Sequence, residues 1–214
     1  GNRLVLWTSG VIVEAQRTDP LTPVIIGAHF NDPAQVRSPD QVTTGFFKGS
    51  IAEVRIWNKA ISLDHIRTNM YRRLNPEANP QLIGYWRFDE GAGNRIINVA
   101  TPAISKANSL SVPSSGKVLN ATWLSTSQFP TLPIPFSLKF NGENAYVDCG
   151  NVQQLTEAIT VEAWVKHING DGLIVYRGGG WLEDGYSLFW CRGKIRVELQ
   201  NTSKKTKLTI DTQE

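Results

Sequence analysis

Hydrophobic and polar residues alternate with a period of two along much of this chain. The clearest case is segment 194–199, and segments 52–56 and 161–166 show the same alternation. Successive side chains of a strand point to opposite faces, so this pattern is typical of strands with one face in a core. The residues predicted to lie in that core are Val54, Ile56, Val161, Ala163, Val165, Ile195, Val197 and Leu199. Charged residues between them, including Arg55 and Glu162, are expected to face outward.

Shorter strand-like runs fill most of the remaining chain, separated by turn residues. Asn141-Gly142, Asp171-Gly172 and Asp184-Gly185 are three such turn signals. Many short strands with turns between them are typical of a sandwich. The predicted fold is therefore all-β, an antiparallel β-sandwich with one short helix. The shorter strand segments are 3–7, 24–26, 85–88, 137–140, 145–148, 173–176, 186–190 and 208–211.

One segment has helical spacing instead. Ser62 is a good N-cap, and apolar residues then recur on one face as far as Leu74, before Asn75-Pro76. The spacing predicts a helix over residues 62–74. From Thr101 to Pro135 the pattern is lost among Ser, Pro, Asn and Gly, which predicts either a connection between domains or loosely paired edge strands anchored by Trp123.

Charge and hydropathy exclude two classes of partner. The chain has 214 residues and a formal net charge of +3, with no clustered basic stripe of the kind that binds nucleic acid. No run reaches the roughly 18 apolar residues that a membrane-spanning helix requires, so no membrane span is expected. Seven tryptophans are many for this length, and such rings pack between sheets or line binding faces.

The residue patterns do not favour catalysis. Glu157 and Glu162 have the outer spacing of the paired carboxylates in glucanases that share a sandwich fold, but Ile159 stands where those enzymes carry an aspartate. Residues five apart on a regular strand also point to opposite faces. The three histidines, His29, His65 and His167, have no acidic or cysteine neighbour at ligand spacing. We therefore expect the chain not to be an enzyme.

The two cysteines leave two possibilities open. Cys149 and Cys191 each fall within a strand-like run. They could form one disulfide, or each could be a buried free thiol, which is common in strands.

Four stretches carry a resemblance to a known family. Phe47 to Ser62 is similar to its closing pattern, a glycine, a strand ending in an aromatic residue and a short helix. Gly84 to Gly93 resembles a "W-x-F-D-E-G-x-G" run that opens repeats in tandem bacterial proteins. Leu138 to Val147 and Ile159 to Lys166 resemble the opening strands. The chain thus resembles the laminin-G-like and pentraxin-like jelly rolls of the concanavalin type.

The order of these patterns predicts how the chain is divided. Residues 1–75 resemble the C-terminal half of one laminin-G-like jelly roll, and residues 136–214 the N-terminal part of a second. Residues 76–135 would be the connection and the opening strand of the next repeat. We expect a piece of a larger protein, with open sheet edges near residues 4–7 and 208–210. The alternatives are strand exchange, or closure of 138–214 and 1–74 on each other as one permuted sandwich.

The resemblance also implies calcium as a possible cofactor. Pentraxin-like relatives place acidic ligands in two loops at the rim of the sandwich, and calcium takes such oxygen ligands. Glu183 and Asp184 match the position of the first loop, and Asn31 and Asp32 lie near the second. These four residues are the predicted metal ligands.

The expected function is recognition. A rigid sandwich with ligand loops at its rim and aromatic rings that can stack on sugars is typical of an extracellular or cell-surface, lectin-like adhesion module. Its partners would be a glycan or a protein surface, and neighbouring repeats of the same protein. The alternatives are a structural spacer or assembly module, or an ancillary domain of a secreted enzyme.

Overall fold

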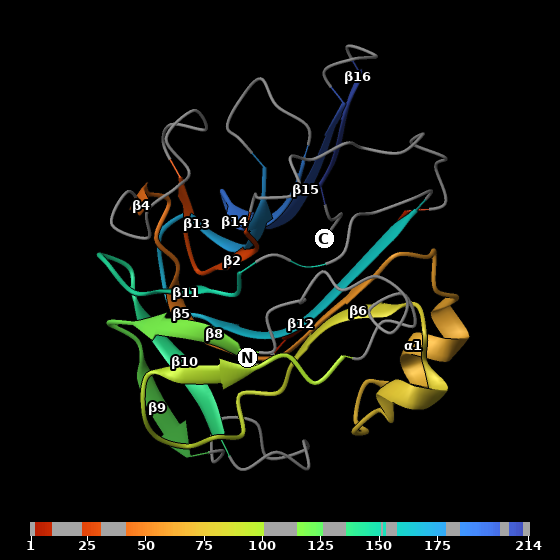
Figure 1. Ribbon diagram of the computed structural model, residues 1–214. Coiled ribbons are helices and arrows are strands. Elements are labelled where there is room, and N and C mark those ends of the chain that lie inside the picture. The colour runs from red at the N-terminus through yellow and green to blue at the C-terminus, as the bar shows by residue number, and fades with distance from the viewer. Residues whose placement is uncertain are drawn as a thin grey trace.

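Two antiparallel sheets pack as a sandwich, which confirms the predicted fold class (Figure 1). The computed structural model describes residues 3–9, 23–30, 42–100, 115–125, 136–150, 152, 158–178, 185–201 and 206–211. Within these residues, sheet A has six strands and sheet B has eight. In sheet A the order is β1 (Arg3–Ser9), β12 (Ile159–His167), β5 (Lys48–Trp57), β10 (Phe136–Asn141) and β9 (Thr122–Ser125), and β6 (Leu82–Trp86) also pairs with β5.

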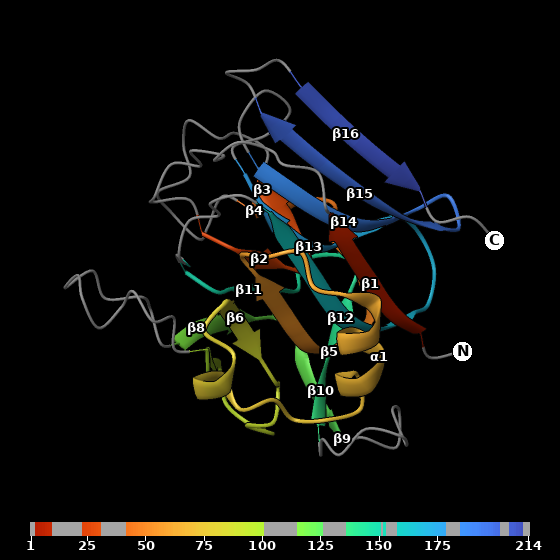
Figure 2. The same cartoon turned by 90° about the vertical axis from the view of Figure 1, so that its right-hand side faces the viewer.

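Sheet B forms the other layer of the sandwich. Its order is β16 (Thr206–Asp211), β15 (Lys194–Asn201), β14 (Gly185–Cys191), β13 (Gly172–Arg177), β2 (Ile25–Ile26), β11 (Tyr146–Asp148), β8 (Ser115–Leu119) and β7 (Arg95–Ile97). Strands β3 (His29–Phe30) and β4 (Val42–Thr44) pair with each other as a separate two-stranded sheet, and a 3₁₀ turn spans Pro76–Ala78. Figure 2 shows β15 and β16 at the outer end of the sheet.

Strands from the two ends of the chain share one sandwich. Strand β1 pairs with β12 over seven residues, from Arg3 opposite Val165 to Ser9 opposite Ile159. Strand β5 lies between β12 and β10. This pairing is the one expected if the two ends of the chain close on each other as one sandwich. It is not the pairing expected of two separate half-cores. It stays a prediction that residues 1–75 and 136–214 belong to two successive repeats. Strands β1 and β16 do lie at sheet edges among the described residues.

The main core lies between the two sheets and contains all eight predicted core residues. Each of them is at most 5% exposed. They pack in one cluster with residues such as Phe140 of sheet A and Val147 of sheet B. The period-two pattern therefore identified the inner face correctly on strands from both sheets.

The charged residues of β5 and β12 do face away from the core, but the face on which they lie is covered and not open to solvent. Arg55 and Glu162 are each 2% exposed, and Glu53 and Trp164 are also buried. A β-bulge lies in this ladder, where Glu53 has a φ of 51° and its carboxylate accepts from Arg55 on the same face. The helix α1 (Leu63–Asn69) and the chain after it cover this face, as Figure 2 shows.

Helix α1 is the predicted helix, but it ends five residues early. Ser62 is its N-cap, and the hydroxyl accepts from the His65 backbone N–H. Beyond Asn69 the carbonyls accept hydrogen bonds from side chains of sheet A instead of from a further helical turn. Leu74 nevertheless packs in a second apolar cluster with Ile66, which holds the segment onto the sheet.

The described part of the segment from Thr101 to Pro135 contains two paired strands, of which one is an edge strand, as the second of the two alternatives expected. Strand β8 lies between β11 and β7, and β9 is the edge of sheet A next to β10. Trp123 anchors β9, since its indole N–H donates to the Gly93 carbonyl at 2.8 Å. Across the described ranges, we find no helix with the length and apolar character needed to cross a membrane.

Val197→Asp should unfold the protein or destabilise it by more than about 3 kcal/mol, because it places an unpaired charge in the core. Val197 is 4% exposed and lies between Leu188 and Ile210 in the sheet. Lys194→Asp, at an exposed position of the same strand, is the control and should cost less than about 1 kcal/mol. Urea denaturation measures both. Equal losses for the two variants would show that the assigned facing is wrong.

Candidate functional site

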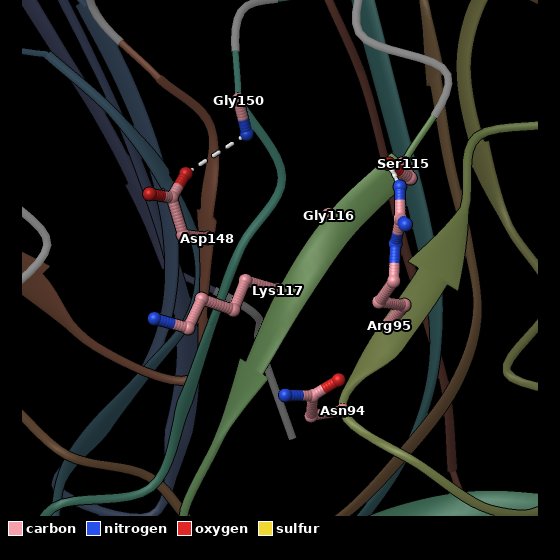
Figure 3. Close-up of a pocket in the computed structure, with 7 residues that line it drawn as sticks. All are labelled: Asn94, Arg95, Ser115, Gly116, Lys117, Asp148 and Gly150. Carbon is pink, nitrogen blue, oxygen red and sulfur yellow. Dashed lines mark hydrogen bonds between the residues drawn. The ribbon is translucent and has the colours of Figure 1, made fainter.

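A polar pocket opens on sheet B where β7, β8 and β11 lie side by side. Asp148 of β11 is directly opposite Lys117 of β8, which is directly opposite Arg95 of β7. The next residues along two of these strands, Val118 and Val147, are in the core. Side chains alternate between faces along a strand, so the charged residues form a row on the outer face. Figure 3 shows these side chains.

The pocket has a volume of about 410 Å³ and a polar lining. Its lining residues are Asn94, Arg95, Ser115, Gly116, Lys117, Asp148 and Gly150. They supply an amide, a guanidinium, a hydroxyl, an ammonium and a carboxylate, and none of these described residues is aromatic. Such a set can donate and accept several hydrogen bonds to one polar ligand.

Asp148 is fixed by the backbone that follows it. Its Oδ1 accepts from the Gly150 N–H at 2.9 Å, and Gly150 has a φ of 64°, which favours glycine. The Gly150 carbonyl in turn accepts from the backbone N–H of Val24 in the neighbouring segment. Burial raises the pKa of the Asp148 carboxyl, although that hydrogen bond and the Lys117 charge act in the opposite direction.

The other side of the pocket is held by β7 and β8. Arg95 Nη2 donates to Ser115 Oγ at 2.8 Å, which orients the guanidinium. The Asn94 carbonyl accepts from the Val118 backbone N–H at 2.8 Å and fixes the start of β7. Gly116 lies in β8, and a Cβ at this position would come within 2.6 Å of the Asp148 carbonyl oxygen. A glycine is therefore required for β8 to approach β11 this closely.

A second polar cluster is buried beneath α1 and is not open to a ligand. Arg55 forms ion pairs with Glu53 at 2.9 Å and with Glu162 at 3.5 Å. Tyr85 Oη donates to Glu53 at 2.7 Å, and Trp57 Nε1 donates to Glu162 at 2.7 Å. We name these five residues the Arg55 network. Each charge has a partner, as buried charges require.

The Arg55 network also holds α1 and the chain after it. Arg55 donates to the carbonyls of Asn69 and Arg72, at 3.2 and 2.6 Å, and Trp164 Nε1 donates to the Met70 carbonyl at 3.0 Å. These carbonyls lie where a helix leaves its last acceptors unsatisfied. The network is therefore best explained as structural: it holds α1 and the chain after it against the outer face of sheet A.

Burial sets the protonation of the acids in this network. It raises the pKa of Glu162 above the ordinary value of 4.5, and the Arg55 charge and the Trp57 hydrogen bond only partly oppose this. Burial likewise raises the pKa of Glu53 against the opposing charge of Arg55. For Arg55 itself, burial acts to lower the pKa, but the charges of Glu53 and Glu162 outweigh it and raise the pKa.

The residues predicted as metal ligands lie outside the described part of the chain. This applies to Glu183, Asp184, Asn31 and Asp32, so the calcium site stays a prediction. Over the described ranges, we find no group of three or more His, Cys, Asp or Glu residues that could hold a metal ion.

The residues weighed for catalysis are not gathered in one place. Glu157 is outside the described residues, and both carboxylate oxygens of Glu162 are engaged in the Arg55 network. His29 bonds Thr44, His65 lies against Trp57, and His167 stacks on Trp190 at the edge of the sandwich. Cys149 and Cys191 are free thiols, so they do not form a disulfide; Cys149 is buried, as the second alternative expected, whereas Cys191 is only partly buried.

Sequence reasoning missed the pocket on sheet B. Arg95, Lys117 and Asp148 are far apart in the sequence, and each has an ordinary strand context. Only the register of β7, β8 and β11 brings them together. The one local signal was Gly116 within an otherwise polar segment, because a strand glycine often marks a close backbone approach.

Arg55→Met should destabilise the protein by about 3–5 kcal/mol, because it leaves two buried carboxylates without their counter-charge. Arg67→Met is the matched control, since Arg67 is exposed on α1. Chemical denaturation at neutral pH measures both variants. If Arg55→Met unfolds at the same denaturant concentration as the control, the network does not hold the fold.

The raised pKa of Glu162 also predicts a pH dependence. The folded state binds the Glu162 proton more tightly than the unfolded state, so this stabilisation is present below pH 4.5 and is lost as pH rises through the raised pKa. Because the side-chain amide of the Glu162→Gln variant does not titrate, the unfolding free energy of the parent minus that of the variant should fall with rising pH and then level off. A difference that grows with pH would mean that the attraction of Arg55 outweighs burial.

Comparison with protein-family models, with curated proteins and with solved structures finds no match for this chain.

Proposed function

We propose that the chain is a non-catalytic recognition module of the extracellular or cell-surface kind, and that it holds a glycan at the polar pocket between β7, β8 and β11. The observation that supports this is the pocket itself. Five kinds of hydrogen-bonding side chain meet there on the outer face of a sheet. Hydroxyl-rich ligands need several donors and acceptors at fixed positions, and regular strands provide such positions.

Two of the polar groups in the pocket are oriented by hydrogen bonds. The carboxylate of Asp148 is fixed by Gly150, and the guanidinium of Arg95 is oriented by Ser115. Ligand groups therefore meet side chains that are already positioned, which lowers the entropic cost of binding.

Two features favour binding over catalysis in the described residues. The pocket contains one carboxylate, Asp148, whereas glycoside hydrolysis by the usual route uses a pair. The buried pair Glu53 and Glu162 is occupied by Arg55 and covered by the segment that contains α1. We accordingly propose no turnover of glycans by this chain.

A spacer or assembly role is the second candidate, and the sheet edges favour it. Strand β1 ends sheet A and β16 ends sheet B among the described residues. Backbone groups at a sheet edge can pair with another chain or with a neighbouring domain. In this role the polar pocket would have no ligand.

Asn94→Ala should weaken glycan binding about two- to tenfold, the effect of losing one hydrogen bond. The side chain of Asn94 is exposed at the pocket, whereas its structural bond uses the backbone carbonyl. A glycan array identifies a ligand, and titration followed by amide chemical shifts gives its affinity and place. Gln81→Ala is the control, an exposed amide before β6, and should bind as the parent does.

Two results would contradict the proposed function. One is the absence of binding to any glycan on the array. The other is binding that shifts only amides away from β7, β8 and β11, which would move the site. Loss of binding in a chelator together with such displaced shifts would support the predicted calcium loops instead.

A further inference from the structure

We infer that the group held in this pocket is an oxyanion, so that the ligand is an acidic sugar carrying a carboxylate or a sulfate. This inference rests on the proposed function and names the chemistry of the same site. The pocket contains two cations, Arg95 and Lys117, and one carboxylate, Asp148. The balance of charge at this part of sheet B is therefore positive.

The one acid of the pocket is already engaged. Asp148 Oδ1 accepts from the Gly150 N–H, and the carboxylate is half-buried beside the backbone of β11. By contrast, Arg95 and Lys117 are exposed side chains. Among the described residues, neither of them takes part in an ion pair within 4 Å. Asp148 balances at most one of the two positive charges, so an anionic ligand would supply a counter-charge for the other.

The register places both cations in one row of the pocket, and Figure 3 shows the Arg95 guanidinium beside Ser115 and the Lys117 ammonium on the side of β11. Arg95 and Lys117 are directly opposite each other on neighbouring strands, whose backbones are about 4.8 Å apart. Ser115 engages Nη2 of the guanidinium and so fixes its plane. A planar guanidinium matches the two oxygens of a carboxylate or a sulfate, and an ammonium adds a second charge. The amide of Asn94 can then bond a neighbouring hydroxyl.

The chemical character of the described lining residues also favours a charged ligand. Sugars without charge are held largely by stacking on aromatic rings and by hydrogen bonds. The described lining residues contain no ring, so we expect hydrogen bonds and charge to supply most of the affinity. Selectivity should therefore follow the charge of the sugar rather than its apolar face.

The test uses the full chain and four probes, sodium glucuronate, glucose 6-sulfate, glucose and sodium sulfate, titrated at low salt and followed by amide chemical shifts. We expect glucuronate, glucose 6-sulfate or both to shift amides of β7, β8 and β11, and glucose to bind at least about tenfold more weakly, the effect of losing a charge-assisted bond. Added salt should weaken binding, since the site is exposed. The two acidic probes distinguish carboxylate from sulfate. Sodium sulfate distinguishes a sugar site from a site for any oxyanion.

Variants assign the effect to the two cations. Arg95→Met and Lys117→Met should each weaken binding of the acidic sugar about tenfold. Lys139→Met, an exposed lysine of β10 in the other sheet, should leave it unchanged. Both cations are exposed, so the variants should fold, and Lys117→Met keeps the test valid if Arg95→Met does not.

The outcomes separate this inference from the proposed function. If glucose binds this pocket as tightly as glucuronate, and Lys117→Met has no effect, the inference is overturned and glycan recognition stands. If sodium sulfate binds as tightly as the acidic sugars, the pocket holds any oxyanion and the acidic-sugar assignment is overturned. If no sugar, acidic or neutral, shifts the amides of β7, β8 and β11, both fail.

Discussion

The charge of Arg55, buried on the outer face of sheet A, is the constraint on which much of this structure depends. A guanidinium that is 2% exposed needs counter-charges and acceptors, and it finds them in Glu53, Glu162 and the carbonyls after α1. Glu53 is on the same strand as Arg55, whereas Glu162 comes from β12 and the carbonyls come from the end of α1 and the chain after it. Satisfying this one group therefore joins β5 to β12 and closes α1 over the sheet.

The ladder between β5 and β12 connects this network to the candidate binding site. Arg55 and Glu162 are register partners, and their neighbours Ile56 and Val161 are partners in the core. Sheet B packs on the other side of that core, and its outer face carries the row from Asp148 to Arg95. The core thus separates a closed polar face, which holds the fold, from an open polar face, which we propose binds a ligand.

The sequence allowed the fold class and the core to be predicted, because alternation along a single strand is a local signal. Val197 and Val161 could be placed in the core without knowing their neighbours. The bulge at Glu53 and the cover over Arg55 could not be foreseen, since both depend on how a distant segment packs. The polar pocket could not be foreseen for the same reason. Arg95 and Lys117 meet only through strand register, which alternation does not determine.

The most direct test of this account is whether β5 and β12 pair within one chain. Isotope-filtered NOE spectroscopy on mixed labelled and unlabelled protein separates contacts inside a chain from contacts between chains. The account predicts intramolecular backbone contacts that follow the register, with Ile56 opposite Val161 and Arg55 opposite Glu162. Contacts found only between chains would mean strand exchange, and no contacts would mean two unpaired halves. Either result would contradict the single sandwich on which the Arg55 network and the pocket depend.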